Sequence, residues 1–226
     1  MEAKNQSTKN ENNDVVIEAL SQFWNKNKRA ISISVLAIVL VVCVNWAYTK
    51  YLQQPKEAKA NDALFKAEEY YRIDSLQKAL NGDGFNLGFI KVIEKYSGTK
   101  AANLAYFYAG DCYLRSGEFA KAVENLKEFN TDAKQIQARA YKLLADAYSE
   151  LNKNEEALEF YKKAAFHFTT DSYNAADYLF NAAQLAEKTG NTKEAIDLYN
   201  QLKEKFPNTQ QSNDADKFLA KLGIYK

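Results

Sequence analysis

Residues 106–126, YFYAGDCYLRSGEFAKAVENL, decide the fold of this 226-residue chain. Large apolar residues recur at helical spacing on both sides of Gly117, with the small pair Ala109 and Gly110 on the first side and Ala122 on the second. Small residues at a contact point let two helices approach closely, and large residues fill the groove beside them. Gly117 suits the left-handed end of a helix. The stretch therefore predicts two antiparallel helices joined by a tight turn.

The same arrangement occurs three times in succession. The small residue of the second helix recurs at Ala122, Ala157 and Ala195, at intervals of 35 and 38 residues, and the later turns carry Asn152 and Gly190. This period and pattern resemble those of the tetratricopeptide repeat (TPR). With few Gly and Pro residues as helix breakers, the sequence predicts an all-α protein. We expect a TPR α-solenoid of antiparallel helical hairpins that follows a single N-terminal transmembrane helix.

The predicted transmembrane helix comes from residues 30–48, AISISVLAIVLVVCVNWAY, which contain no charged residue. As a helix this segment is about 28 Å long, close to the thickness of a hydrocarbon core. Trp24 precedes it and Tyr51 follows it, as expected for aromatic belts at both interfaces. A signal peptide would begin closer to the N-terminus and end at a small-residue cleavage site, and a buried core helix is the other alternative. We predict a retained anchor.

Cations on the two sides of this segment predict its orientation. Lys26, Lys28 and Arg29 directly precede it, whereas Lys50 alone directly follows it. The positive-inside rule then places the N-terminus in the cytoplasm and the C-terminal domain outside. In a Gram-negative cell, a protein of this orientation lies in the bacterial inner membrane with its repeats in the periplasm.

The sequence divides into six segments. Val16, Leu20, Phe23 and Trp24 fall on one helical face before the span, and Asn81 to Gly84 form a strong turn signal. The predicted segments are a disordered cytoplasmic tail (1–14), an amphipathic juxtamembrane helix (15–29), the transmembrane helix (30–50), a long helix from Glu57 to about Leu80 with a degenerate first TPR-like hairpin (51–101), three TPR repeats (102–207) and a C-terminal capping helix (208–226).

Composition excludes several classes of function. The net charge of +1 argues against nucleic acid as a partner. The single histidine, His167, and the two cysteines, Cys43 and Cys112, cannot assemble a familiar catalytic set or a disulfide framework. No Gly-rich phosphate loop is present. We therefore predict no enzymatic activity, no catalytic, cofactor-binding or metal-binding residue, no cofactor, and no small-molecule substrate.

The first helices of stacked TPR hairpins line a concave surface, which is where we expect proteins to bind. Alignment on the marker alanines predicts the residues of this surface: Leu104, Phe107, Asp111, Leu114 and Arg115; then Arg139, Lys142, Asp146 and Glu150; then Asp177, Phe180, Gln184 and Lys188. Phe107 and Phe180 are either apolar anchors for a partner or core residues packed against neighbouring hairpins. Arg139 and Lys142 could clamp a carboxylate, although Asp146 one turn away competes with it.

Residues 16–51, VIEALSQFWNKNKRAISISVLAIVLVVCVNWAYTKY, resemble the start of the bacterial YfgM family, an ancillary subunit of the SecYEG translocon. The matching residues are Glu18, Ala19, Leu20, Phe23, Trp24, Lys26 and Asn27. The resemblance implies a chaperone-like helper beside the Sec translocon, with membrane-anchored periplasmic chaperones and emerging secreted clients as partners. One alternative is a TPR scaffold of another envelope machine, for outer-membrane protein assembly or cell division. A mitochondrial import receptor and an enzyme are further alternatives.

Overall fold

The computed structural model describes the backbone of residues 2–224 and the side chains of Glu18 and residues 21–224. Within these residues the chain is helical, and one isolated bridge between Gly82 and Leu87 is the only strand-like pairing. The helices are α1 (Glu2–Tyr48), the π-helical η1 (Thr49–Gln53), α2 (Gln54–Arg72), α3 (Leu76–Asn81), α4 (Phe89–Lys95), α5 (Lys100–Arg115), α6 (Phe119–Glu128), α7 (Lys134–Glu150), α8 (Asn154–His167), α9 (Ser172–Lys188), α10 (Thr192–Lys205) and α11 (Gln210–Lys221). They form two compact units, residues 1–55 and 56–226.

The first unit consists mainly of α1. A single helix in the described part of the chain is long and apolar enough to cross a membrane, and none of its apolar window is buried. Ile33 and Val41, for example, are each 68% exposed. A core helix of a soluble protein would have such side chains covered, so a membrane span and a signal sequence remain as the two interpretations.

The N-terminal part of α1 differs from the sequence expectation. The helix runs unbroken from Glu2, where composition predicts a disordered tail over residues 1–14 and a separate helix over residues 15–29. Extending an existing helix costs far less than starting a new one, and the Glu, Lys, Gln and Ala of this segment favour extension. The side chains of Val16 and Leu20 lie outside the described residues.

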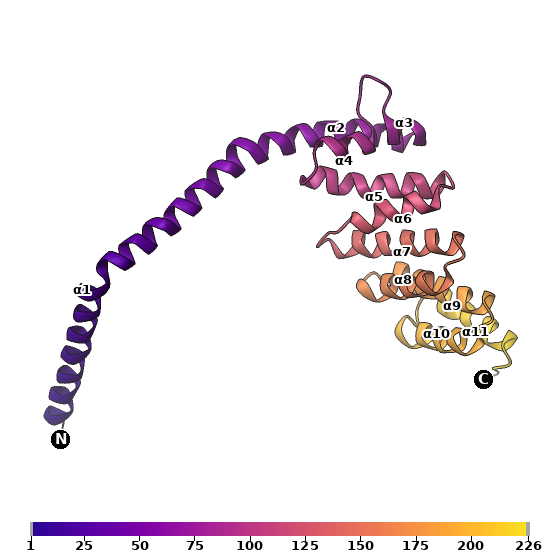
Figure 1. Cartoon of the computed structure of the whole chain (residues 1–226). Coiled ribbons are helices and arrows are strands. Elements are labelled where there is room, and N and C mark those ends of the chain that lie inside the picture. Colours follow the sequence, from indigo (N-terminus) through magenta and orange to yellow (C-terminus); the bar gives the residue numbers. More distant parts are fainter. Residues whose placement is uncertain (1, 225–226) are drawn as a thin grey trace. The chain divides into compact units, whose positions relative to one another are not determined.

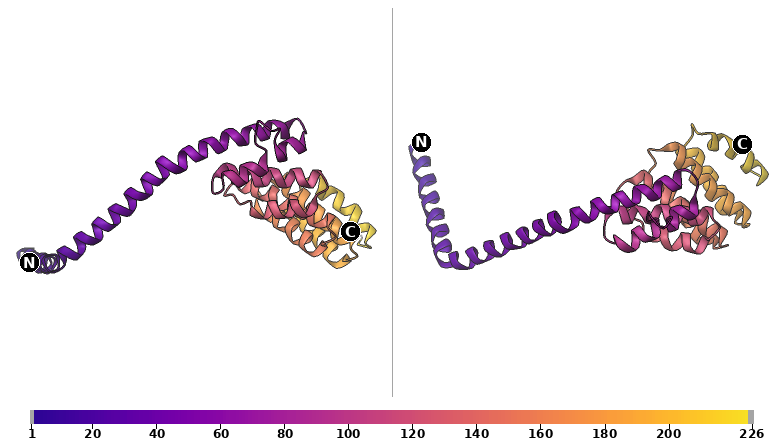
Figure 2. Two further views of the ribbon diagram at one scale, coloured as in Figure 1. Left: turned by 45° about the horizontal axis from the view of Figure 1, so that its top comes forward. Right: turned by 90° about the horizontal axis from the view of Figure 1, so that it is seen from above.

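The second unit is a row of helical hairpins stacked in chain order (Figure 1). The hairpins α5–α6, α7–α8 and α9–α10 fall at the three predicted repeats, and α11 packs against α10 and α9. Gly117, Asn152 and Gly190 adopt left-handed backbone angles (φ 78°, 58° and 78°) at the three turns. The sequence prediction of an all-helical TPR fold is therefore confirmed, and the stack appears from two further directions in Figure 2.

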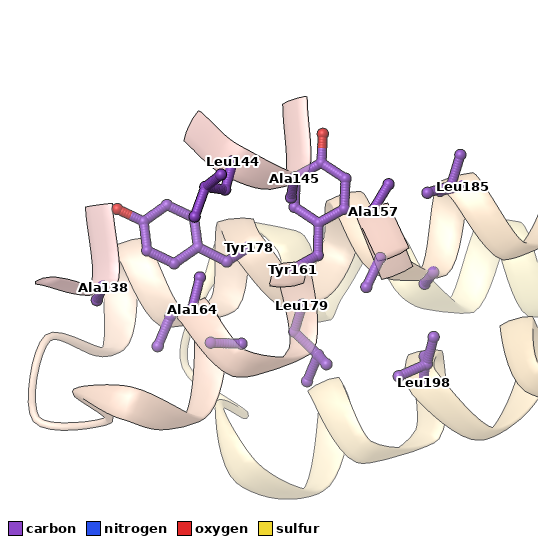
Figure 3. Close-up of a cluster of buried hydrophobic side chains, with 14 of the residues drawn as sticks. Ala138, Leu144, Ala145, Ala157, Tyr161, Ala164, Tyr178, Leu179, Leu185 and Leu198 are labelled. Atoms are coloured by element: carbon purple, nitrogen blue, oxygen red, sulfur yellow. The ribbon is translucent and has the colours of Figure 1, made fainter. Parts of the chain in front are cut away.

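Small residues allow the two helices of each hairpin to pack closely. The marker alanines Ala122, Ala157 and Ala195 are completely buried. A Cβ added to Gly110 would lie 2.4 Å from the Cγ of Leu126 on α6, so the α5–α6 contact has no room for a side chain there. In Figure 3 large side chains such as those of Tyr161 and Leu179 lie among the alanines of the core.

The first hairpin is where the predicted helix boundaries are wrong. The expected helix from Glu57 to about Leu80 is broken at Asp74, whose left-handed backbone (φ 61°) separates α2 from α3. The carboxylate of Glu57 on α2 accepts hydrogen bonds from the backbone N–H groups of Lys100 (2.9 Å) and Ala101 (3.0 Å) at the start of α5. An anion at a helix N-terminus satisfies unpaired donors and opposes the helix dipole. This contact fixes α2 against the first complete repeat.

Candidate protein-binding surface

A groove of about 430 Å³ lies between α7 and α9, the first helices of two successive repeats. Its lining comes from residues three or four positions apart on each helix, which share one helical face. The opposite side of α7 is buried against α8 through residues such as Leu144 and Tyr148. The lining residues are Gln135, Ile136, Arg139, Lys142 and Leu143 on α7, and Asn174, Asp177 and Tyr178 on α9.

Of the two cations that line this groove, Lys142 is paired with a described carboxylate and Arg139 is not. The ammonium of Lys142 lies 2.7 Å from a carboxylate oxygen of Asp146, and the other oxygen accepts a hydrogen bond of 2.7 Å from the hydroxyl of Tyr161. Burial and the negative charge of Asp146 raise the pKa of Tyr161 far above its ordinary value. Asp146 therefore neutralises Lys142, and a ligand carboxylate would have to compete with it.

Arg139 has no such partner among the described residues. Its guanidinium is exposed and lies 5.9 Å from the ring centroid of Phe107, without a carboxylate within ion-pair distance. Asp177 on the facing helix accepts a hydrogen bond of 3.3 Å from the side-chain amide of Asn181. The groove thus presents one uncompensated cation and one carboxylate above an apolar floor of Leu143 and Tyr178.

One end of the groove is held rigid by Asp171. Its side chain accepts hydrogen bonds from the amide groups of Gln135 (3.0 Å) and Asn174 (2.8 Å). The Asn174 side-chain amide is the main cause that lowers the pKa of Asp171 below its ordinary value. Groups that are fixed before binding lose less conformational entropy when a ligand arrives.

Some of the predicted surface residues lie in this groove and others do not. Arg139, Lys142 and Asp177 line it. Glu150, Gln184 and Lys188 are exposed on the same two helices but lie outside the lining. Five further lining residues were not predicted: Gln135, Ile136, Leu143, Asn174 and Tyr178.

Phe107 is a core residue, which corrects its assignment as a surface anchor. The side chain is only 6% exposed, and its ring centroid lies 5.2 Å from that of Phe129 and 5.6 Å from that of Tyr108. Phe180 is partly buried and packs edge-on against Tyr199 and Phe218. Phe107 thus packs against the end of α6 in its own hairpin, and Phe180 packs against α10 and α11, so core packing is the alternative that holds.

The predicted residues on α5 serve to hold α2. Asp111 is 5% exposed, and its carboxylate accepts a hydrogen bond from the hydroxyl of Tyr71. Arg115 forms an ion pair with Asp74 and lies 3.9 Å from Asp111. Burial and the hydrogen bond to Asp111 raise the pKa of Tyr71 to about 12. Leu104 and Leu114 pack partly buried against the core. A partner cannot reach the carboxylate of Asp111 without displacing α2.

Cys112 and His167 belong to residue types that often act in catalytic sites, but here both pack against other side chains of the repeat unit. Cys112 is completely buried, which raises the pKa of its thiol to about 12. His167 packs edge-on against Tyr141, with 5.3 Å between ring centroids. Among residues whose side chains are described, no group of three or more His, Cys, Asp or Glu could hold a metal ion.

Comparison with known protein families agrees with this architecture. A family model described as "Tetratricopeptide repeat" matches residues 142–209, which hold α8 to α10 and most of α7. A second, described as "Tetratricopeptide repeat-like domain", matches residues 21–169, from within α1 to the end of α8. No curated protein sequence matches the chain. Since the second match covers well over half of the chain, this protein belongs to the family of tetratricopeptide repeat-like domain proteins.

Proposed function

We propose that this protein is a membrane-anchored interaction module whose α7–α9 groove binds segments of partner proteins. The observation that carries the proposal is the groove itself, which lies between the first helices of two TPR hairpins. TPR domains are protein-interaction modules, and an extended or helical segment fits a groove of this kind. The ligand would place an apolar side chain against Leu143 and Tyr178 and an acidic group near Arg139.

The proposed location is a bacterial inner membrane with the repeats in the periplasm. Support comes from the unburied apolar helix and from Lys26, Lys28 and Arg29 on its N-terminal side. A tether of this kind raises the concentration of the groove near the membrane surface and so strengthens otherwise weak binding. A retained span has this effect, whereas a cleaved signal sequence does not.

We further propose that the protein assists the Sec translocon as a chaperone-like helper. The resemblance of residues 16–51 to the start of the YfgM family supports this role, with the translocon, membrane-anchored chaperones and emerging secreted proteins as partners. A TPR scaffold of an outer-membrane assembly or cell-division machine is the alternative. Co-purification from solubilised membranes distinguishes the two, because only the first role recovers translocon subunits.

The topology can be tested with Ser172→Cys, an exposed position on α9, in a Cys43→Ser background. Cys112 can stay, since its complete burial protects it from a maleimide. We expect a membrane-impermeant maleimide to label Ser172→Cys in cells whose inner membrane is intact. Labelling only after disruption of the inner membrane would place the repeats in the cytoplasm.

The groove can be tested by charge reversal at Arg139. We expect Arg139→Glu to reduce crosslinking from a photoreactive residue at Ile136 about tenfold, which corresponds to about 1.4 kcal/mol. Stability should change little, because an exposed cation–π contact contributes about 0.5–1 kcal/mol. Lys188→Glu, which makes the same change of sign outside the groove, is the matched control and should crosslink as the unaltered protein does. Equal yields from both variants would remove Arg139 from the binding surface.

A further inference from the structure

The two walls of the α7–α9 groove carry charges of opposite sign. Arg139 on α7 forms one wall and Asp177 on α9 belongs to the other. Neither side chain forms an ion pair with another described residue. Asp177 accepts a hydrogen bond of 3.3 Å from the side-chain amide of Asn181, one turn along its own helix. Each wall therefore offers a partner one charge that is still free to form an ion pair.

Arg139 extends its positive charge over the α7 wall toward α5. Its guanidinium lies 5.9 Å from the ring centroid of Phe107 on α5. Burial raises the pKa of Tyr108 on α5 and of Tyr178 on α9, and the positive charge of Arg139 opposes both shifts. An arginine held among aromatic rings is a frequent hot spot of protein interfaces. This part of the concave surface is therefore suited to an acidic group.

The surface near Asp177 is acidic. Burial, followed by the negative charge of Asp146, raises the pKa of Tyr161 on α8 far above its ordinary value. The charges of Glu150 and Asp177 add to this effect, so the three carboxylates lie around one hydroxyl. Lys142 pairs with Asp146 at 2.7 Å. Glu150 is exposed and Asp177 lines the groove, and this side therefore attracts a cation.

This distribution of charge disfavours a ligand that carries only negative charge. A chain terminus or a purely acidic segment would need two free cations, but Asp146 already neutralises Lys142. A second negative group would then face Asp177 across the groove. Like charges brought together in an interface oppose binding and exclude the wrong partner.

We propose that the groove selects an amphipathic helix of a partner protein that carries an acidic and a basic side chain on either side of an apolar one. The acidic group pairs with Arg139 and the basic group with Asp177, while the apolar side chain rests on Leu143 and Tyr178. This inference rests on the binding function proposed for the groove and specifies the chemistry of the partner.

Helix geometry gives the spacing of the three side chains. With 3.6 residues per turn, the positions three before and three after an apolar residue lie about 60° to either side of it. If the apolar residue faces the floor of the groove, these two positions face opposite walls, as in other complexes of a helix in a groove. Reversing the direction of the helix exchanges the walls, so an acidic residue on either side of the apolar one satisfies the pattern.

Five synthetic peptides test the charge pattern against the full chain in lipid nanodiscs. Each is a 17-residue alanine-based helix, acetylated and amidated to remove the terminal charges, with a central leucine. The positions three before and three after the leucine carry glutamate and lysine, lysine and glutamate, two glutamates, two lysines or two glutamines. By fluorescence anisotropy we expect the two mixed peptides to bind at least tenfold more tightly than the other three. Their net charge is zero, so long-range attraction does not account for this preference.

Charge reversal on one wall should change which peptide binds best. In Asp177→Lys both walls are cationic, and we expect the peptide with two glutamates to bind most tightly. In Arg139→Glu both walls are acidic, and the peptide with two lysines should bind most tightly. Lys188→Glu, outside the groove, is the matched control and should keep the preference for mixed charge. Asp177→Lys should melt with the unaltered protein, because it loses only a hydrogen bond of 3.3 Å.

The outcomes separate this inference from the function on which it rests. Equal affinities for the mixed and the two-glutamate peptides, both weakened by Arg139→Glu, would overturn the charge pattern and leave the groove as a binding site. An unchanged preference in Asp177→Lys would exclude Asp177 from recognition and overturn it as well. If no peptide binds at millimolar concentration while Ile136 still crosslinks to a partner protein, the inference alone is wrong. If that crosslinking is also absent, the proposed binding function fails with it.

Discussion

Replacing Phe107 by alanine is expected to lower the free energy of unfolding of the repeat unit by about 3–5 kcal/mol. The ring is 6% exposed and packs against Phe129 and Tyr108. Its removal leaves a cavity in the core. Urea denaturation of residues 56–226, followed by circular dichroism, measures the change. Tyr173→Ala is the control, because Tyr173 is 69% exposed and should cost at most about 0.5 kcal/mol. If Phe107→Ala lowers the free energy of unfolding no more than the control does, Phe107 is a residue of the binding surface and not of the core.

Replacing Phe89 by alanine is expected to cost a similar 3–5 kcal/mol, with a different local consequence. Phe89 opens α4 and is completely buried, stacked on Tyr108 of α5 (5.3 Å between centroids) and edge-on to Tyr71 of α2 (6.4 Å). Its ring therefore joins three helices by side-chain packing. Its loss should loosen the first hairpin more than the three repeats that follow.

Hydrogen exchange distinguishes this local effect from global destabilisation. We expect faster exchange in α2 and α4 of Phe89→Ala, with α9 and α10 close to their original protection, because a solenoid contacts only its neighbours. Phe85→Ala, four residues away and fully exposed, is the matched control and should leave both regions unchanged. Uniform acceleration across all helices would show that the stack unfolds as one unit.

Repeat periodicity was enough to predict the fold and much of its detail. The marker alanines lie at the predicted close contacts, and Asn152 adopts the left-handed turn expected of it. These features are local or periodic, so one chain reveals them. The break at Asp74 was not predictable in the same way. Asp tolerates the left-handed region only modestly better than other residues. The backbone hydrogen bonds that close the end of α2, from Asp74 to Tyr71 and from Ser75 to Tyr70, require no particular side chain. The ion pair that adds to them comes from Arg115, 41 positions later.

The binding surface was predicted in part for a related reason. The spacing that identifies the first helices also identifies the face on which Arg139 and Lys142 lie, and both line the groove. It also indicated that Asp146, one turn after Lys142 on the same helix, competes for that cation. It could not show that Phe107 is covered by Phe129, or that Asp146 also accepts a hydrogen bond from Tyr161 on α8. Those are contacts between helices. A helical period predicts the direction in which a side chain points, but it does not predict which side chains of other helices contact it. The unpredicted Gln135, Ile136 and Asn174 lie one turn before the predicted residues.

The carboxylate of Glu57 has a mechanical consequence. It accepts hydrogen bonds from two backbone N–H groups at the start of α5. Toward the other end of α2 and α5, the hydroxyl of Tyr71 donates a hydrogen bond to Asp111. A force that pulls α2 along its own axis loads both attachments together in shear, whereas a force that lifts α2 sideways breaks them one after the other. Tension that reaches the repeats through α2 is therefore resisted most strongly along the helix axis. Under such a load we expect these two attachments to break before any repeat hairpin opens.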